Sequence, residues 1–179
     1  MLRRIVCVSA LAVMLAPMLV SAADFSLTGS NTTITFIGTK PQGKHDGGFK
    51  TVTGTASVQN NDPTTLKISL DIDINSLYSD NPKLTKHLLS PDFFAAKSNP
   101  KSKFVSTKVE KSGDEYKITG DFTMLGKTNT ITVPAKLAVG GDGLSLSSAF
   151  SIDRTQWGMT FGQGKVDNAV KLTVTIKAK

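Results

Sequence analysis

Cysteine is almost absent from this sequence. The single cysteine, Cys7, lies in an apolar N-terminal stretch, so the rest of the chain has no thiol. Without thiols, the folded part cannot form disulfide bonds, bind metal through thiolates or use a cysteine nucleophile. We therefore expect its stability to come from the burial of apolar side chains.

The N-terminal stretch has the features of a secretory signal peptide. Arg3 and Arg4 precede an apolar segment, residues 5–20, and the residues VSA at 20–22 are typical of a cleavage site. This apolar run is shorter than the roughly 20 residues that a membrane-spanning helix needs. The sequence predicts that residues 1–22 are a signal peptide. Residues 23–179 are then one exported domain, which we place in the periplasm.

Histidine is also scarce. Neither His45 nor His87 has a second metal-binding residue three or four positions further on, which argues against a metal site. No serine stands in a GxSxG elbow, and the carboxylate pair Asp71 and Asp73 lies on the outer face of a predicted strand. We therefore expect a binding protein and not an enzyme, without catalytic residues or a metal.

Blocks of like charge are missing, although the formal net charge is +7. Scattered lysines are typical of solvated strand faces. Contact with anionic headgroups at a membrane surface is the alternative. Few aromatic residues and no basic helix argue against nucleic acid as a partner.

Apolar residues at every second position are the dominant pattern. Between residues 66 and 74 the apolar side chains occupy every even position, which predicts a half-buried strand. Short polar turns separate such segments, which favours antiparallel neighbours. We therefore predict an all-β fold, an elongated antiparallel barrel of about eight strands with an apolar interior. The further strand segments are 25–27, 34–36, 49–58, 104–109, 116–124, 131–137, 144–152 and 170–176.

Two strand segments carry additional signals. The faces of segment 104–109 cannot be assigned from its pattern. Pro134 lies inside segment 131–137, and because proline has no N–H to donate, it predicts an edge, a bulge or a strand start.

Residues 76–102 have no strand period. Asn81 followed by Pro82 is typical of a helix start, and Leu84 and Leu88 then share one face of a short helix. The residues SPD at 90–92 repeat the start signal before Phe93 and Phe94. This helical insertion is expected at the barrel mouth, as a lid that controls ligand access or as a plug.

Small inward residues favour space inside the barrel over a filled core. Gly120, Ala135 and Ser148 interrupt the inward rows, and those rows contain few large rings. At the end of one strand, Arg154 predicts either binding of a polar headgroup or an ion pair that closes the barrel. Trp157 is expected as a plug or as part of the ligand path.

Four segments in the same order resemble the YceI-like, polyisoprenoid-binding family. They are HLLSPDFF at 87–94, PKSKFVS at 100–106, GDFT at 120–123 with Gly126, and IDR at 152–154 with Gly158. The resemblance covers essentially the whole of residues 23–179. It implies a lipocalin-like eight-stranded barrel in the periplasm, whose interior holds a long isoprenoid or similar lipid.

The sequence and this resemblance lead to three hypotheses. The first is binding, transport or storage of an isoprenoid or similar apolar lipid, with an isoprenoid quinone among the candidates; the lipid would be the only bound cofactor. The second is an envelope stress or interaction protein with a filled barrel, and the third is a lipid-modifying enzyme that uses His87 or Arg154. Homodimer formation is left open. The residues expected to contact the ligand are Phe49, Ile68, Leu70, Ile72, Leu84, His87, Leu88, Phe93, Phe94, Ile118, Phe122, Phe150, Arg154 and Trp157.

Overall fold

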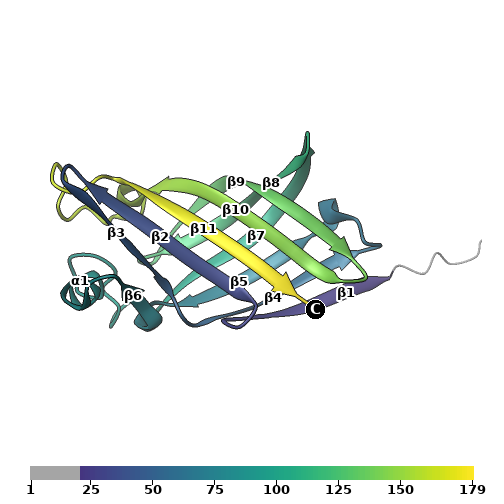
Figure 1. Ribbon diagram of the computed structural model, residues 1–179, viewed down its shortest axis with the longest axis horizontal. Coiled ribbons are helices and arrows are strands. Elements are labelled where there is room, and N and C mark those ends of the chain that lie inside the picture. Colours follow the sequence, from purple (N-terminus) through teal and green to yellow (C-terminus); the bar gives the residue numbers. More distant parts are fainter. Residues whose placement is uncertain (1–20) are drawn as a thin grey trace, which may run out of the picture.

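The computed structural model describes residues 21–179. The predicted signal peptide lies outside the described residues except for its last two, and the first strand begins at Ala22. The all-β prediction is confirmed, because eleven antiparallel strands form one sheet (Figure 1). The strands are β1 (Ala22–Thr28), β2 (Thr32–Lys40), β3 (Gly43–Phe49), β4 (Val52–Gln59), β5 (Lys67–Asp73), β6 (Leu77–Ser79), β7 (Lys101–Ser112), β8 (Glu115–Met124), β9 (Lys127–Gly140), β10 (Gly143–Asp153) and β11 (Ala169–Ala178).

The sheet curls on itself into a half-barrel. Its strand order is β1-β4-β5-β7-β8-β9-β10-β11-β2-β3-β6, so β1 and β6 are its two edges. Residues 29–31 alone connect β1 at one edge to β2 near the other, and three residues span only about 10 Å. The two ends of the sheet must therefore approach each other. The predicted count of about eight strands is wrong, and closure into a complete barrel is not confirmed.

The strands that the sequence did not predict are β3 and β6. Strand β3 is rich in glycine, and three-residue β6 is too short to show a period. At Gly47 a Cβ atom would collide with the ring of Phe36 and the main-chain oxygen of Tyr78, so only glycine fits there. The segment expected as one strand at 49–58 is divided, because β3 ends at Phe49 and β4 begins at Val52.

A bulge in β7 explains why its faces were ambiguous. The pairing of β7 with β8 shifts register between Ser106 and Lys108. An extra residue in one strand reverses the alternation beyond it. Phe104 and Val109 therefore both pack against the interior, although they are five positions apart.

Pro134 marks a local strand edge, which is one of the three alternatives predicted for it. Strand β9 pairs with β10 only from Lys136 onward, whereas the residues before it pair with β8 alone. At Pro134 no strand pairs with β9 on the β10 side, so a main-chain N–H is not needed there for strand pairing. Its carbonyl accepts a hydrogen bond from Ser148 Oγ at 2.5 Å.

The helical insertion is confirmed as α1 (Pro82–Leu88), between β6 and β7. Asn81 caps it, because its Oδ1 accepts hydrogen bonds from the N–H groups of Lys83 (2.9 Å) and Leu84 (3.3 Å). The second start signal, at 90–92, is followed by turns and not by a helix. No helix within residues 21–179 has both the length and the apolar character needed to cross a membrane.

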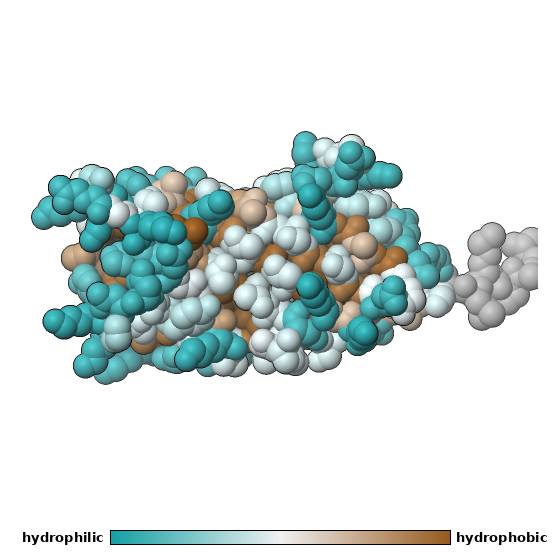
Figure 2. All heavy atoms as spheres, viewed as in Figure 1, coloured by the Kyte–Doolittle hydropathy of each residue, from teal (hydrophilic) through white to brown (hydrophobic). Residues whose placement is uncertain are grey.

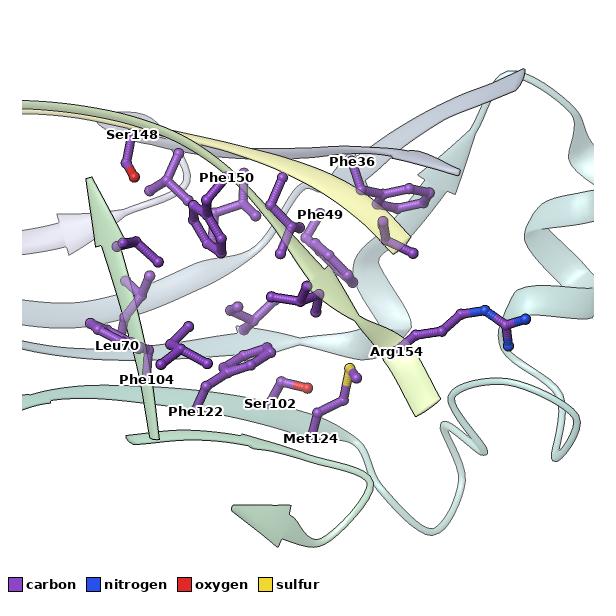
Figure 3. Close-up of a pocket in the computed structure, with 18 of the residues that line it drawn as sticks. Phe36, Phe49, Leu70, Ser102, Phe104, Phe122, Met124, Ser148, Phe150 and Arg154 are labelled. Atoms are coloured by element: carbon purple, nitrogen blue, oxygen red, sulfur yellow. The ribbon is translucent and has the colours of Figure 1, made fainter. Parts of the chain in front are cut away.

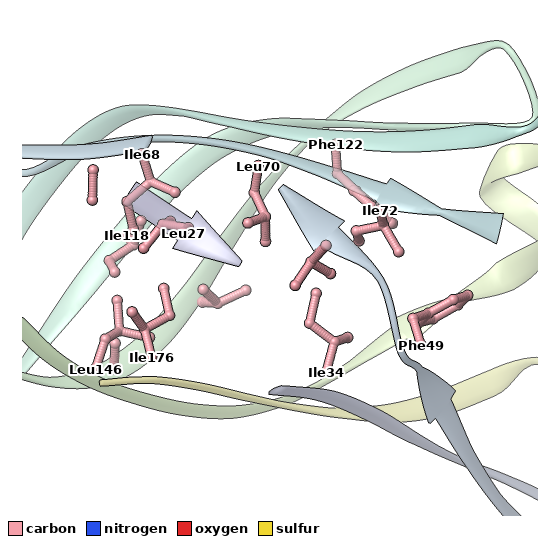
Figure 4. Close-up of a cluster of buried hydrophobic side chains, with 14 of the residues drawn as sticks. Leu27, Ile34, Phe49, Ile68, Leu70, Ile72, Ile118, Phe122, Leu146 and Ile176 are labelled. Atoms are coloured by element: carbon pink, nitrogen blue, oxygen red, sulfur yellow. The ribbon is translucent and has the colours of Figure 1, made fainter. Parts of the chain in front are cut away.

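The two ends of the half-barrel differ in packing. At the end away from α1, large apolar side chains fill the interior; Figure 4 shows Leu27 among Ile68 and Ile118. The opposite end carries α1, and Figure 2 shows hydrophilic side chains gathered over it. We call the first the filled end; its central side chains are all at most 7% exposed and comprise Phe25, Leu27, Val58, Leu66, Val109 and Leu144.

Candidate ligand-binding cavity

The half-barrel encloses a cavity of about 180 Å³ between the filled end and the end that carries α1. Eight strands supply its wall, β2, β3, β5 and β7 to β11. Where the cavity reaches the end near α1, side chains from two connecting segments complete it. We call these side chains the mouth: Leu88, Phe93, Phe94, Met159 and Val166.

The cavity wall is almost entirely apolar (Figure 3). Ser102, Ser148 and Arg154 are the three polar side chains that line it. On β11 the lining runs from Val170 to Ile176, which corresponds to about 20 Å at the rise of a β-strand. A long, narrow and apolar wall is suited to an extended hydrocarbon chain.

Two aromatic groups border the mouth. On the side of β2 and β3, the Phe49 ring packs against Phe36, with centroids 5.9 Å apart, and edge-on against Phe94 at 6.0 Å. The edge-to-face contact with Phe49 fixes the position of Phe94, which comes from the turns after α1. The insertion is therefore attached to the cavity wall through an aromatic ring.

The second aromatic group is at the outer surface. The His87 ring lies edge-on to Phe93 at 5.0 Å and to Phe161 at 5.1 Å. His87 Nε2 and Asp92 Oδ2 are 2.8 Å apart, and the His87 side chain is 43% exposed. His87 therefore lies at the surface. It contacts Phe93 from outside and does not line the cavity.

Arg154 is buried at 2% exposure and makes no ion pair among the described residues. Its guanidinium donates to three main-chain carbonyls instead: Met159 (2.6 Å), Asp167 (3.1 Å) and Val166 (3.3 Å). Burial lowers the pKa of Arg154, while the charge of Asp153 opposes this shift. Of the two alternatives predicted for Arg154, the barrel-closing ion pair is not found within residues 21–179, and the guanidinium instead holds the segment 159–167 through its main chain.

Trp157 lies behind the cavity wall and not in it. It is 2% exposed, and its Nε1 donates to the carbonyl of Phe122 at 2.9 Å. The indole packs against the Phe122 ring with centroids 5.4 Å apart. Because Phe122 lines the cavity, Trp157 supports the wall from outside. The main-chain oxygen of the preceding residue, Gln156, accepts a hydrogen bond from Asn129 Nδ2 of β9 at 3.2 Å, which attaches this segment to β9.

All but three of the residues expected to contact a ligand line the cavity. The three exceptions are Leu84, which lies half-buried on α1, His87 and Trp157. The others are Phe49, Ile68, Leu70, Ile72, Leu88, Phe93, Phe94, Ile118, Phe122, Phe150 and Arg154.

Sequence reasoning missed further lining residues. Several of them lie on β9, β10 and β11, and Leu146, Leu172 and Val174 are examples. They belong to alternating apolar rows that predicted these strands. The alternation could therefore have identified them as lining residues. Met159 and Val166 come from a segment without secondary-structure period, and nothing in their pattern indicated them.

The expectation about small inward residues needs correction. The space beside Gly120 is occupied by the ring of Phe104, with which a Cβ atom would collide. Ala135 is buried but does not line the cavity. Of the three small residues, only Ser148 borders the open space.

A group of three or more metal-binding side chains does not occur within residues 21–179. The fold and the cavity define an all-β, barrel-like protein with an apolar interior that can hold a small molecule. The family model of the YceI-like domain matches residues 25–178, and the chain therefore belongs to the YceI-like family.

A curated relative agrees with this assignment, and two solved structures share the fold. Protein YceI of Escherichia coli O157:H7 is 38% identical over 96 residues, which are 54% of this chain and 50% of that protein. The matched part thus spans about half the length of that curated relative. Burkholderia cenocepacia BcnA superposes with a TM-score of 0.75 at 22% identity, over 83% of this chain and 96% of that one. A polyisoprenoid-binding domain from Saccharophagus degradans, implicated in plant cell wall breakdown, superposes with a TM-score of 0.67 at 9% identity. The superposition covers 89% of this chain and 100% of that domain.

Proposed function

We propose that this protein binds a long-chain apolar lipid, an isoprenoid or one of similar shape, in the cavity of the half-barrel. The observation that carries the proposal is the wall itself, which is long and almost entirely apolar and which extends to the mouth. Each CH₂ group removed from water contributes about 0.8 kcal/mol. A chain of a few isoprene units therefore supplies ample free energy for retention, even after the cost of ordering it.

The proposal includes the compartment and the role. With residues 1–22 as a signal peptide, the protein acts in the periplasm as a carrier or store of the lipid. The family assignment supports lipid binding, as does the structural likeness to the polyisoprenoid-binding domain from Saccharophagus degradans. The filled-barrel hypothesis assumed an interior without open space, which the cavity contradicts. The enzyme hypothesis relied on His87 or Arg154, and of these only Arg154 lines the cavity.

The direct test is to identify what the protein carries. The mature chain, residues 23–179, is purified from periplasmic extract and examined by native mass spectrometry and by extraction with organic solvent. We expect a co-purifying apolar lipid. A protein that is consistently empty and takes up no long-chain lipid contradicts the proposal.

Trp157 offers a second measurement, because it is the only tryptophan and contacts the wall residue Phe122. A prenyl quinone in the cavity should quench its fluorescence. In a separate experiment, with uptake read by native mass spectrometry, the variant Val174→Trp introduces an indole that occupies the open space and should abolish uptake while leaving the fold intact. Thr173→Trp is its matched control, since Thr173 is adjacent on β11 but does not line the cavity, and it should bind normally. Equal uptake by both variants would place the lipid elsewhere.

A further inference from the structure

One polar atom in the apolar wall has no partner. Ser102 is 3% exposed and lines the cavity, and its Oγ is the one buried side-chain polar atom in the described residues without a hydrogen bond. A buried hydroxyl without a partner is unfavourable, and most such groups in proteins are satisfied. Ser148, the other lining serine, follows the rule by donating to the carbonyl of Pro134.

The position of Ser102 is near the mouth. It is the second residue of β7, where that strand leaves the insertion, and it pairs with Ile72 near the end of β5. Met124, the last residue of β8, lies beside it in Figure 3. The strands run from this point toward the filled end, so a ligand whose head is at Ser102 has its tail in the apolar interior.

On the basis of the proposed function, we infer that the bound lipid carries a hydroxyl or carbonyl oxygen that hydrogen-bonds to Ser102 Oγ. Ser102 then selects an oxygen-bearing head group and sets the depth at which the chain enters. A water molecule is a poorer partner, because buried waters are held by two to four polar groups and the wall around Ser102 is apolar. A head-group oxygen is held there by its own chain.

Arg154 is not the residue that binds the head-group oxygen. Three of its five N–H donors are used by the carbonyls of Met159, Val166 and Asp167. Its guanidinium is directed away from the aliphatic side chains in Figure 3, and the three carbonyls that it binds belong to the segment 159–167. Among the polar side chains that line the cavity, Ser102 alone has no hydrogen-bond partner within residues 21–179.

The test removes the protein hydroxyl and the ligand oxygen separately and together. The probes are geranylgeraniol, the aldehyde of the same chain and the hydrocarbon without the oxygen, with affinities measured by displacement of cis-parinaric acid. We expect Ser102→Ala to weaken binding of at least one oxygenated probe by about five- to tenfold, the value of one hydrogen bond. Binding of the hydrocarbon should be unchanged. If Ser102 donates, both oxygenated probes lose affinity; if it only accepts, the alcohol alone does.

Ser148→Ala is the matched control. It removes a lining hydroxyl that is already satisfied, so it should lower the urea midpoint of unfolding without discriminating among the probes. Ser102→Ala should not lower the midpoint, because no hydrogen bond within the protein is lost. Equal losses for all three probes, or no loss for any, would overturn the inference while leaving lipid binding intact. Failure of the wild type to bind even the hydrocarbon would instead contradict the proposed function.

Discussion

The filled end and the cavity end are built from the same strands with the same alternating pattern, yet they pack differently. Along β11 the inward side chains Val170, Leu172 and Val174 are half-buried, whereas Ile176 and Ala178 are 1% and 2% exposed. The alternation is identical over this stretch. What changes is whether side chains from other strands reach the axis of the half-barrel. Strand β1 provides Phe25 and Leu27 at the filled end, whereas the mouth side chains at the other end come from connecting segments.

Because of this difference, the two ends of the half-barrel have different roles. The filled end holds the sheet together by close packing, which is the main source of stability in a chain without disulfides. The cavity end gives up part of that packing and retains open apolar surface. A ligand bound there restores buried area, so the stability of the cavity end should depend on ligand concentration.

The largest expected effect is a difference in the free energy of unfolding between a truncation at the filled end and one at the cavity end. Leu27→Ala removes a side chain that is 1% exposed, and we expect a loss of about 2–5 kcal/mol in the free energy of unfolding. Leu172→Ala shortens a half-buried side chain beside space that is already open, so its cost should be about 1 kcal/mol or less. Urea unfolding of both variants, without added lipid, measures the difference. Equal costs would mean that the two ends are packed alike.

The next effect concerns the segment that Arg154 clamps. Arg154→Met keeps an apolar stem but removes three hydrogen bonds to main-chain carbonyls, and we expect a cost of about 2–4 kcal/mol. The loss should be local, because those carbonyls belong to Met159, Val166 and Asp167. Amide hydrogen exchange should accelerate in residues 158–168 and stay unchanged in β1 and β4. Uniform acceleration would show that Arg154 stabilises the whole sheet.

Much of this arrangement was predictable from the sequence, because strand period depends on local chemistry. The rows on β5, β8, β10 and β11, the cap at Asn81 and the local edge at Pro134 were all read from residue type and spacing. The family was recognised from four short segments, and the family model confirms it.

The missed features depend on contacts between distant residues. Strand β3 forms because Gly47 and Gly48 let Phe36 and Tyr78 approach closely, and a sequence pattern does not record such proximity. The bulge in β7 changes the phase of the alternation without a glycine or proline to mark it. The roles of Arg154 and Trp157 likewise rest on main-chain carbonyls, which every residue possesses and no motif identifies.

The smallest expected effect compares two aspartates that cap short 3-10 helices at opposite ends of the molecule. Asp62 lies at the filled end, and hydrogen bonds from the main chain and side chain of Thr64 lower its pKa. At the cavity end, hydrogen bonds from the side chain and main chain of Thr155 lower the pKa of Asp153, and the charge of Arg154 adds to the effect. A carboxyl with a lowered pKa stabilises the fold above its ordinary pKa of about 3.9, and this stabilisation is lost as the pH falls through the folded-state value.

Asparagine keeps the capping oxygen but does not titrate, so Asp62→Asn and Asp153→Asn should each reduce the loss of stability between pH 5 and pH 2. Urea midpoints across this range measure the change. At low salt the reduction should be larger for Asp153→Asn, because of the two aspartates only Asp153 has a neighbouring cation. Added salt screens that attraction, so the reductions measured for the two variants should become equal. A salt-independent difference would mean that the Thr155 hydrogen bonds alone set the pKa of Asp153, and that Arg154 acts only through the carbonyls it clamps.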